Sequence, residues 1–505
     1  MPNYGFAIDL RKCIGCHACS IACKAEHDVP IGVNRCWVKT VEKGTFPDTR
    51  RLFLPVLCNQ CDNAPCVKIC PTNALYKRRD GIVDLNGDSC IGCRSCMNAC
   101  PYDQLFIDPD TRTAEKCNFC ANRVEQELLP ACVIVCPTQC RIFGDLNDPA
   151  SEVSRIVARE STTVRKPEKD TLPKIFYVGA DDAILRPEVA ARPLMFREGQ
   201  VILRPIGAPD PIPGDPGAPR VDYDVPHKQA WGHDLVAYLF AKGVATGALF
   251  LAAVLALLGH GGSLVHVVAP IISVVFGALT AFVLVIDLER PERFYYILTR
   301  SNWRSWLVWG AWFLTAHGVL SVLWVVAWLF GLDGLRRLIL VPSLVASVLA
   351  TGYTGFLFAQ GLARDLWQGP SATIDLLAQA AAAGAGILLI AGVPFGLVDA
   401  AVLRLLSLVL GISLSAHVVI LVVEHVLTPH ATRHHELAAR TIVRGPFATL
   451  FWGGAVLVGG ILPAAVSLAA PAATTPIVAA AFLALAGGLA WEYIWVEAGQ
   501  SVPNS

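Results

Sequence analysis

The sequence predicts two domains of different fold class: a small α+β domain, followed by an all-α bundle of about eight transmembrane helices. Two observations support this division. Seventeen of the 18 cysteines lie between Cys13 and Cys136. Residues 1–230 carry 29 of the 41 Lys and Arg and 29 of the 41 Asp and Glu, which leaves 12 of each for the remaining 275 residues. So long a stretch with so little charge is typical of a membrane domain.

Sixteen of the cysteines fall into four sets with related spacing. The first and third sets read C-x2-C-x2-C-x3-C, the second has one wider gap, and the fourth has a long gap before its third member. A proline follows the last cysteine of the second, third and fourth sets. The sets are Cys13, Cys16, Cys19 and Cys23; Cys58, Cys61, Cys66 and Cys70; Cys90, Cys93, Cys96 and Cys100; and Cys117, Cys120, Cys132 and Cys136.

This spacing predicts iron–sulfur clusters. Three thiolates of a C-x2-C-x2-C run can wrap one corner of a cube, while the fourth cysteine points away and serves the other cluster of a pair. Structural zinc sites use pairs of C-x2-C, and a disulfide framework would not repeat one run four times. We therefore expect four [4Fe–4S] clusters. Cys36 and Cys140 lie outside the pattern and are expected to be small buried residues, and His17 to lie beside a cluster without ligating it.

Within residues 1–150, apolar runs at 6–9, 51–54 and 81–84 predict short strands, and Asp-Gly and Asn-Gly pairs predict hairpin turns. Together with the cysteine sets, they predict a doubled ferredoxin-like domain. Residues 151–230 are expected to form an extended connector, because seven prolines between Pro205 and Pro226 exclude a helix or an inner strand.

Residues 231–505 contain eight apolar segments, each long enough to span a hydrocarbon core as a helix. They lie near 235–258, 264–286, 307–330, 338–361, 373–393, 401–424, 447–468 and 476–496. Eight spans place both termini on one side of the membrane.

The arginines in the loops predict which side this is. The loops on the side of the termini carry eight arginines and the opposite loops three. The positive-inside rule then places the cysteine-rich domain in the cytoplasm, on the cytoplasmic (inner) membrane of the cell. The start of the sequence shows no apolar or twin-arginine export signal, which agrees with a cytoplasmic location. The balanced net charge implies no nucleic-acid partner.

Polar residues within the spans are candidates for function, because burying them in lipid is costly. His317 and His417 lie at similar depth, which leaves axial ligation of a b-type haem open beside plain hydrogen bonding between helices. The other candidates lie toward the cysteine-rich side: His233, Asp234, Asp287, Tyr353, Glu424 and His425.

Both halves show a resemblance to known families. The cysteine sets, with the long gap from Cys120 to Cys132, resemble the four-cluster subunit (NrfC or dimethyl sulfoxide reductase B type) of membrane-bound molybdopterin oxidoreductases. The second half resembles their NrfD/polysulfide-reductase-type membrane anchor, in YLFAKGVATGALF at 238–250, DLERPERF at 287–294 and TGYTG at 351–355. The fusion itself departs from the usual arrangement of two separate polypeptides.

The resemblance implies how the ligands are shared and where a quinone binds. Anchors of this type lack haem and bind quinone near the cluster side, where His233 and Tyr353 match side chains that hydrogen-bond it. Four ligand groups are implied: Cys13, Cys16 and Cys19 with Cys136; Cys117, Cys120 and Cys132 with Cys23; Cys58, Cys61 and Cys66 with Cys100; and Cys90, Cys93 and Cys96 with Cys70.

The sequence thus predicts an electron-transfer and quinone-binding subunit of an oxidoreductase. Electrons would pass through the clusters between a large molybdopterin-binding catalytic subunit and menaquinone or ubiquinone. Asp287 and Glu424 are the candidates for a proton path. Two alternatives remain open: a stand-alone ferredoxin-like quinone oxidoreductase, and an element of a larger proton-translocating complex.

Overall fold

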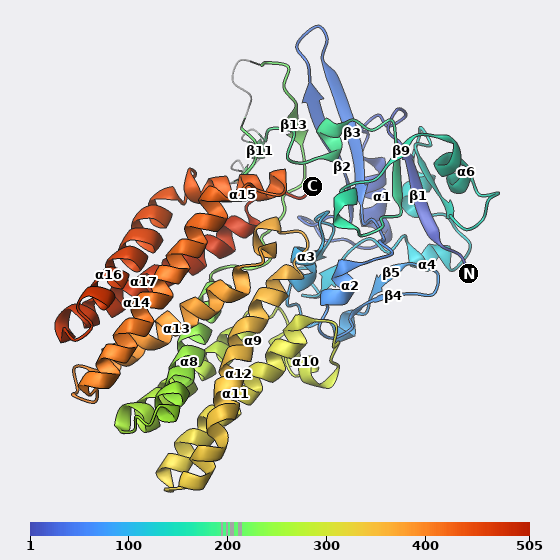
Figure 1. Ribbon diagram of the computed structural model, residues 1–505. Helices are drawn as coiled ribbons and strands as arrows, with labels where there is room; N and C mark the ends of the chain where they lie inside the picture. The colour runs from blue at the N-terminus through green and yellow to red at the C-terminus, as the bar shows by residue number, and fades with distance from the viewer. Residues whose placement is uncertain (193–194, 198–199, 203–206, 211–214) are drawn as a thin grey trace.

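A computed structural model describes residues 1–192, 195–197, 200–202, 207–210 and 215–505, with only the backbone described for 195–197 and 200–202. Figure 1 shows a domain of small sheets and short helices lying against one end of a bundle of long helices. The predicted fold class, a ferredoxin-like domain followed by a transmembrane bundle, is confirmed.

The largest sheet of the first domain has four strands in the order β8-β1-β10-β9. Strand β1 pairs antiparallel with β8 and parallel with β10. Its residues Phe6, Ala7 and Ile8 are fully buried, so the apolar run at 6–9 forms a strand because it crosses the core. The strands are β1 (Tyr4–Asp9), β8 (Arg141–Asp145), β9 (Thr162–Thr163) and β10 (Ile175–Val178).

The other sheets are smaller. A three-stranded sheet has the order β13-β2-β3, and its strand β3 contains the predicted run 51–54. Three hairpins complete the set. The strands are β2 (Cys36–Lys43), β3 (Arg50–Leu57), β4 (Leu75–Lys77), β5 (Val83–Leu85), β6 (Phe106–Ile107), β7 (Ala114–Glu115), β11 (Met195–Arg197), β12 (Gln200–Ile202) and β13 (Arg220–Tyr223).

Short helices carry several of the cysteines. Cys19 and Cys23 lie on α1, Cys66 on α2, Cys96 on α3 and Cys132 on α5. The helices of this domain are α1 (Ala18–Glu26), α2 (Pro65–Ile69), α3 (Ser95–Ala99), α4 (Ala121–Val124), α5 (Ala131–Ile134), α6 (Glu152–Arg159) and α7 (Asp182–Leu185).

The expected connector differs from the structure over residues 152–185. This stretch forms α6, β9, β10 and α7, and β10 is an inner strand of the main sheet. Its residues Ile175 and Tyr177 are fully buried, and this tertiary burial outweighs the polar character of the surrounding sequence. Of the proline-rich run, Pro205, Pro211 and Pro213 lie outside the described residues, and residues 220–223 form the edge strand β13.

Among the described residues, eight helices are long and apolar enough to cross a membrane, which confirms the predicted number. They are α8 (His233–Leu257), Leu264–Ile286 ending in α9 (Ala269–Ile286), α11 (Trp306–Leu329), α12 (Asp333–Ala359), α13 (Ala372–Gly392), Ala400–Leu427 beginning with α14 (Ala400–Val422), Leu450–Ala469 ending in α16 (Leu462–Ala469), and α17 (Thr474–Gln500). The shorter α10 (Tyr296–Thr299) and α15 (Arg433–Val443) lie in loops.

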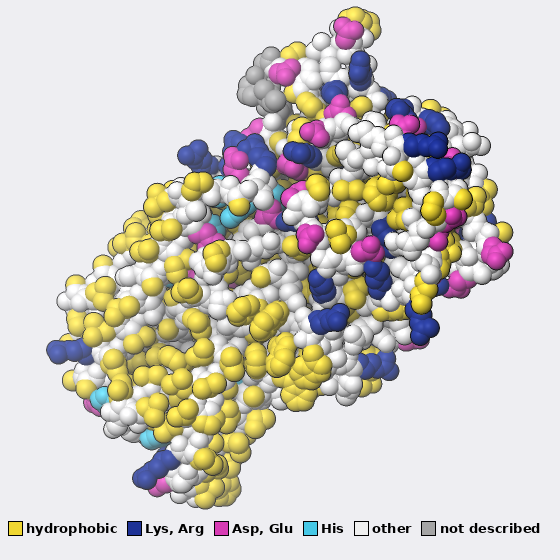
Figure 2. Space-filling view, turned by 45° about the vertical axis from the view of Figure 1, so that its right-hand side comes forward, with side chains coloured by type: hydrophobic (Ala, Val, Ile, Leu, Met, Phe, Trp, Pro, Cys, Tyr) yellow, Lys and Arg dark blue, Asp and Glu magenta, His cyan; other side chains and the backbone are white. Residues whose placement is uncertain are grey.

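Helix α8 is the centre of the bundle and packs against α9, α12 and α13. Its Gly247 lies so close to α13 that an added Cβ would stand 1.9 Å from the carbonyl oxygen of Ala380. Such direct backbone contact is how small residues join helices in lipid. The outer surface of the bundle is largely apolar, whereas charged side chains gather on the first domain (Figure 2).

Candidate functional site

The four cysteine sets share one backbone feature. In each set, the residue directly before the second cysteine has a left-handed conformation, which turns the backbone around the thiols. These residues are Gly15 (φ 69°), Gln60 (φ 46°), Gly92 (φ 68°) and Phe119 (φ 57°). Two of the four are not glycine, although a left-handed residue with a side chain is strained. This repetition indicates that all four loops are shaped for one purpose.

The first and fourth sets lie together. Cys13, Cys16, Cys19 and Cys136 line one small cavity. Burial, followed by the charges of Cys117, Cys132 and Cys120, raises the pKa of the Cys23 thiol, so these three are its neighbours. Each group therefore takes its fourth cysteine from the other set.

The second and third sets show the same exchange. Burial raises the pKa of the Cys66 thiol. The charges of its neighbours Cys100, Cys58 and Cys61 raise it further. After burial, the cysteines that raise the pKa of Cys96 are Cys93, Cys90 and Cys70, followed by Cys66 of the neighbouring group. These neighbours are the basis on which the four ligand groups implied by the resemblance are proposed below.

The chemistry of these groups fits iron–sulfur clusters. All 18 cysteines have free thiols, and most of the 16 are buried. Backbone N–H groups of Leu75, Ala114 and Phe119 donate to the sulfurs of Cys70, Cys90 and Cys117 at 3.5, 3.5 and 3.4 Å, as expected around a cluster that carries negative charge. A bound cluster would supply a one-electron carrier at each group.

Three residues near the first set are not part of the ligand groups. His17 (φ 60°) occupies the same left-handed loop position as Arg94 (φ 59°) in the third set, and its ring packs edge-on against Tyr223. Cys36 and Cys140 are buried, as expected. Cys140 nevertheless lies close to the first group, with its sulfur 3.5 Å from that of Cys136.

The group that contains Cys90, Cys93, Cys96 and Cys70 adjoins the membrane domain. Trp231, just before α8, donates from its indole to the carbonyl oxygen of Cys93 at 3.3 Å. Arg293 donates to the carbonyl of Cys90 at 2.9 Å, and Asn302 to that of Cys70 at 2.8 Å. All three donors come from the α8, α9–α10 and α10–α11 regions.

Asp287 also joins the third cysteine set to the membrane domain. Its carboxylate pairs with the guanidinium of Arg94, the residue after Cys93. Burial raises the pKa of Asp287, while the charge of Arg94 opposes that shift. Asp287 therefore holds the two domains together directly beside the third cysteine set.

Tyr353 is buried in a network of hydroxyl groups with one ammonium. Its hydroxyl meets that of Tyr238 on α8, and Lys242 donates to Thr354. Thr351 donates to Thr246 at 2.8 Å. The α8 residues of this network, Tyr238, Lys242 and Thr246, are spaced i, i+4, i+8, and therefore share one face of the helix. That spacing is the sequence signal for the network.

The structure does not bring His233 and Tyr353 into contact. His233 is exposed at the start of α8, and its ring stacks on Tyr493 of α17 with centroids 5.8 Å apart. Tyr238, the partner of Tyr353, follows five residues later and so points about 140° away around the helix axis. The two residues thus face different neighbours, and neither lines the cavities described here.

A cavity of about 630 Å³ lies between α8, α9 and α11. We call it the lipid-side cavity, because exposed apolar residues such as Phe294, Val319 and Val322 border it. Its polar lining includes Lys242 and His317. His317 is held by Ser273 at 3.1 Å and Ser347 at 3.3 Å.

The second half of the bundle holds charged groups. His417 on α14 pairs with Asp375 on α13 at 2.5 Å, and Gln379 donates to the same carboxylate at 2.7 Å. Glu424 accepts from Ser371. Glu492 on α17 is 5% exposed. His417 and His317 thus line different cavities, and each imidazole already has a hydrogen-bond partner within the protein.

Sequence reasoning missed Lys242, Asp375 and Glu492. Each is a charged residue inside an apolar span, and such residues are candidates for function because their burial is costly. The sequence signal for all three is therefore the charge itself, at whatever depth of the span it lies.

Comparisons with known proteins agree with this architecture. Residues 224–504 match the family described as "Polysulphide reductase, NrfD", and residues 49–146 match a 4Fe-4S dicluster domain.

Three relatives match the first domain. A tetrathionate reductase subunit of Salmonella typhimurium is 44% identical over 201 residues, 39% of this chain and 80% of that protein. A polysulfide reductase component of Wolinella succinogenes is 44% identical over 181 residues, 35% of this chain and 94% of that protein. The arsenate respiratory reductase iron-sulfur subunit ArrB of a Shewanella species is 37% identical over 222 residues, 34% of this chain and 95% of that protein.

The NrfD match covers more than half of the chain, and the iron–sulfur match precedes it, with residues 147–223 between the two. The chain therefore belongs to the polysulphide reductase NrfD family and is a multi-pass membrane component of an oxidoreductase, with an iron–sulfur electron-transfer domain fused to its membrane anchor.

Proposed function

We propose that this chain carries electrons between a separate catalytic subunit and quinone in the membrane, through four [4Fe–4S] clusters held by the four ligand groups. The observation that supports this most is the contact between the Cys90–Cys96 loop and the first half of the bundle. The cysteines proposed as this ligand group thus lie beside helices that border the lipid-side cavity.

The opposite end of the series of ligand groups is the proposed contact with the catalytic subunit. Cys16 is exposed there, and exposed apolar side chains surround the first set: Ile14, Ile21, Ile134 and Val135. An apolar surface around an electron port suits a stable protein partner. The three relatives named above are components of reductases, which is consistent with a large partner that binds molybdopterin.

The lipid-side cavity is the proposed quinone site. Its volume is in the range of small-molecule pockets, and its lining is apolar with few polar groups. Lys242 lines it and connects through Thr354 and Tyr238 to Tyr353. Tyr353 would thus act on menaquinone or ubiquinone by way of this network. His233 remains a candidate for headgroup binding at the cluster-side end of α8.

Protons for the quinone are proposed to enter from the cluster side. Asp287 lies at the end of α9, directly before Leu288 of the cavity lining. Glu424 lies near the cluster-side end of the span Ala400–Leu427, in the second half of the bundle. The arginine bias of the loops supports a cytoplasmic location for this side. A reporter fused after Ser505 should then be active only as a cytoplasmic reporter, and export of that reporter would contradict the orientation.

The test uses the purified full-length protein reduced with dithionite. Decylubiquinone or menadione should reoxidise its clusters, followed by absorbance, and ferricyanide should do so directly. Tyr353→Phe and His233→Ala should slow quinone-driven reoxidation several-fold, because a lost hydrogen bond costs about 0.5–1.5 kcal/mol. Reoxidation by ferricyanide should not change. Equal quinone kinetics in both variants and the parent would place the site elsewhere.

Two alternatives lead to different measurements. A stand-alone quinone oxidoreductase would purify without a large partner, so identifying the largest co-eluting subunit separates it from the main proposal. An element of a proton-translocating complex is favoured by one observation, the buried charged groups in the second half of the bundle. In that case quinone turnover in liposomes would move protons across the membrane.

A further inference from the structure

Four cavities of the membrane domain are linked by shared residues. The first, which we call the entrance cavity, has a volume of about 750 Å³ and shares Glu424 with a small upper cavity of about 10 Å³. The upper cavity shares Gln379 with a central cavity of about 40 Å³. The central cavity shares Lys242 with the lipid-side cavity. Glu424, Gln379 and Lys242 thus connect the loop side of the bundle with the proposed quinone site.

The entrance cavity lies where the cluster domain meets the second half of the bundle. Its lining includes Lys169 of the first domain and Asp365, Glu424, His430 and His435 of the second. Lys169 pairs with Asp365. Among the described side chains, the buried ring nitrogens His430 Nδ1 and His435 Nε2 have no hydrogen-bond partner. Polar groups on a wide cavity at this position can exchange protons with water.

The upper cavity leads inward from Glu424. It is lined by Asp375, Gln379, Glu424 and His425. Asp375 accepts from Gln379 at 2.7 Å and bonds His417 at 2.5 Å. His417 and Gln379 both line the central cavity. These side chains therefore provide donors and acceptors from one cavity to the next.

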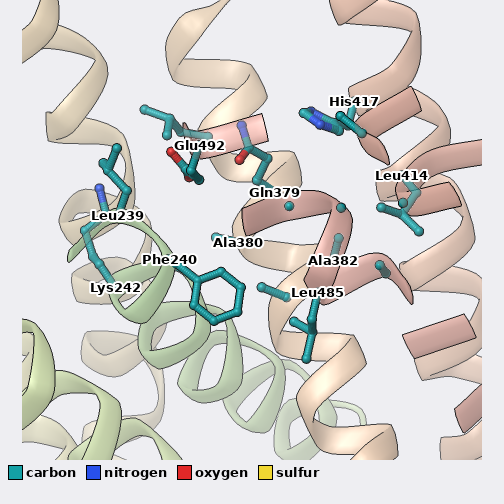
Figure 3. Close-up of a pocket in the computed structure, with 18 of the residues that line it drawn as sticks. Leu239, Phe240, Lys242, Gln379, Ala380, Ala382, Leu414, His417, Leu485 and Glu492 are labelled. Carbon is teal, nitrogen blue, oxygen red and sulfur yellow. The ribbon is translucent and has the colours of Figure 1, made fainter. Parts of the chain in front are cut away.

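The central cavity contains the most deeply buried carboxylate of the series. Figure 3 shows the Glu492 carboxylate between the Lys242 amine and the Gln379 amide, with His417 across the cavity. No described residue bonds Glu492 Oε2, although the side chain is about nineteen-twentieths buried. A volume of 40 Å³ has room for a water, since a cavity of about 10–15 Å³ is sufficient.

Helix geometry places the last two groups at one depth. Lys242 is nine residues from the cluster-side end of α8, and Glu492 eight residues from the cluster-side end of α17, so each lies about 12–14 Å into the bundle. Both side chains line the central cavity. Lys242 also lines the lipid-side cavity, so it is the point where the two cavities meet.

We propose that Glu424, Asp375 with His417, Gln379, Glu492 and Lys242 form a proton path from the entrance cavity to quinone in the lipid-side cavity. The inference rests on the proposed function. One quinone takes up two electrons from the cluster domain and two protons, and its two carbonyl oxygens become the hydroxyls of quinol. The path delivers those protons through the second half of the bundle, and quinol oxidation runs the same transfers in reverse.

If these groups had a purely structural role, their variants would behave differently. A buried ion pair is weak as a source of stability, and its replacement by apolar residues of similar size is often neutral. The path also continues on both sides of Lys242 and Glu492, into cavities that a structural pair does not need. The proposal therefore predicts a defect in proton transfer that does not involve quinone binding.

The experiment compares Glu492→Gln and Glu424→Gln with Glu497→Gln, a carboxylate on α17 outside these cavities. The reduced full-length protein is mixed with decylubiquinone in lightly buffered detergent solution that contains a pH dye. Cluster reoxidation and proton uptake are followed together, and quinone binding is measured on the oxidised protein. Both path variants should slow quinone-driven reoxidation and proton uptake about tenfold or more, as expected for a lost proton-transfer group.

Quinone affinity and reoxidation by ferricyanide should stay within twofold of the parent, and Glu497→Gln should behave like the parent. Glu492→Asp should restore part of the rate. If Glu492→Gln does not fold, Asp375→Asn gives the same comparison. Parental rates in Glu424→Gln and Glu492→Gln would overturn the path. If the parent itself reacts with ferricyanide but not with quinone, the proposed function fails instead.

Discussion

The two halves of the membrane bundle are built differently. In the first half, α8 to α12, the helices α8, α9 and α11 line the lipid-side cavity with apolar side chains, hydroxyls, His317 and Lys242. The second half, α13 to α17, holds the carboxylates of Asp375, Glu424 and Glu492 near imidazoles. The close contacts of Trp231, Arg293 and Asn302 with cysteine carbonyls also come from the first half. We propose that this difference reflects a division of labour, with electrons and quinone in the first half and a proton path that runs through the second half to Lys242.

The largest effect is expected from Cys93→Ala, which removes the ligand beside the first half. The purified parent should contain about sixteen iron and sixteen sulfide with no stoichiometric zinc, and the variant roughly four fewer of each. Quinone-driven reoxidation should be abolished, while the membrane domain stays folded because it has its own core. Cys36→Ala is the matched control and should keep the parental iron content. A zinc-containing parent would contradict the cluster assignment.

A smaller effect is expected from separating the two halves. Gly384→Ala would place a Cβ 2.3 Å from the backbone carbon of Gly247, so α8 and α13 must move apart. We expect a loss of about 1–3 kcal/mol in unfolding free energy from overpacking, with slower proton uptake. Gly453→Ala, whose Cβ meets nothing within 4 Å, is the control. Unfolding in detergent measures both, and equal stabilities would show that the contact is not tight.

The third expected effect is on the pH dependence of stability, at the contact between the second half and the cluster domain. Burial, together with the charges of Lys166, Arg364 and Lys169, lowers the pKa of His434 to about 3. The folded protein therefore keeps this ring neutral, whereas the unfolded chain takes up a proton below its ordinary pKa of about 6.5. Stability from His434 is thus present above pH 6.5 and lost as pH falls below it.

Between pH 7 and pH 5 this loss amounts to about 2 kcal/mol. His434→Gln should remove that part of the pH dependence, whereas His260→Gln in the α8–α9 loop should keep it. Unfolding midpoints at the two pH values measure the difference. The same pH dependence in His434→Gln and the parent would mean that another group causes it.

Sequence reasoning reached furthest where spacing and chemistry coincide. The cysteine sets predict the thiol groups because cluster geometry allows few spacings, and apolar length predicts the eight helices because the bilayer has a fixed thickness. Strand β10 was missed because its pairing with β1 joins residues about 170 positions apart, as with Phe6 and Ile175.

Within the membrane domain, the sequence could name polar residues but not pair them. His233 and Tyr353 share the cluster side of the bundle, yet they point to different neighbours because of where they lie around α8 and α12. That Lys242 and Glu492 line the same cavity depends on how α8 and α17 pack, which no local pattern specifies. Rotation about the helix axis, more than depth, is therefore what the structure adds.

The most direct measurement places the reduced full-length protein in liposomes that contain decylubiquinone, with a pH dye on the side of the cluster domain. We predict that quinone reoxidises the clusters and that about two protons disappear from the cluster side for each quinol formed, as the balance of the reaction requires. Clusters that ferricyanide oxidises but quinone does not, or protons taken up from the opposite side, would contradict the account.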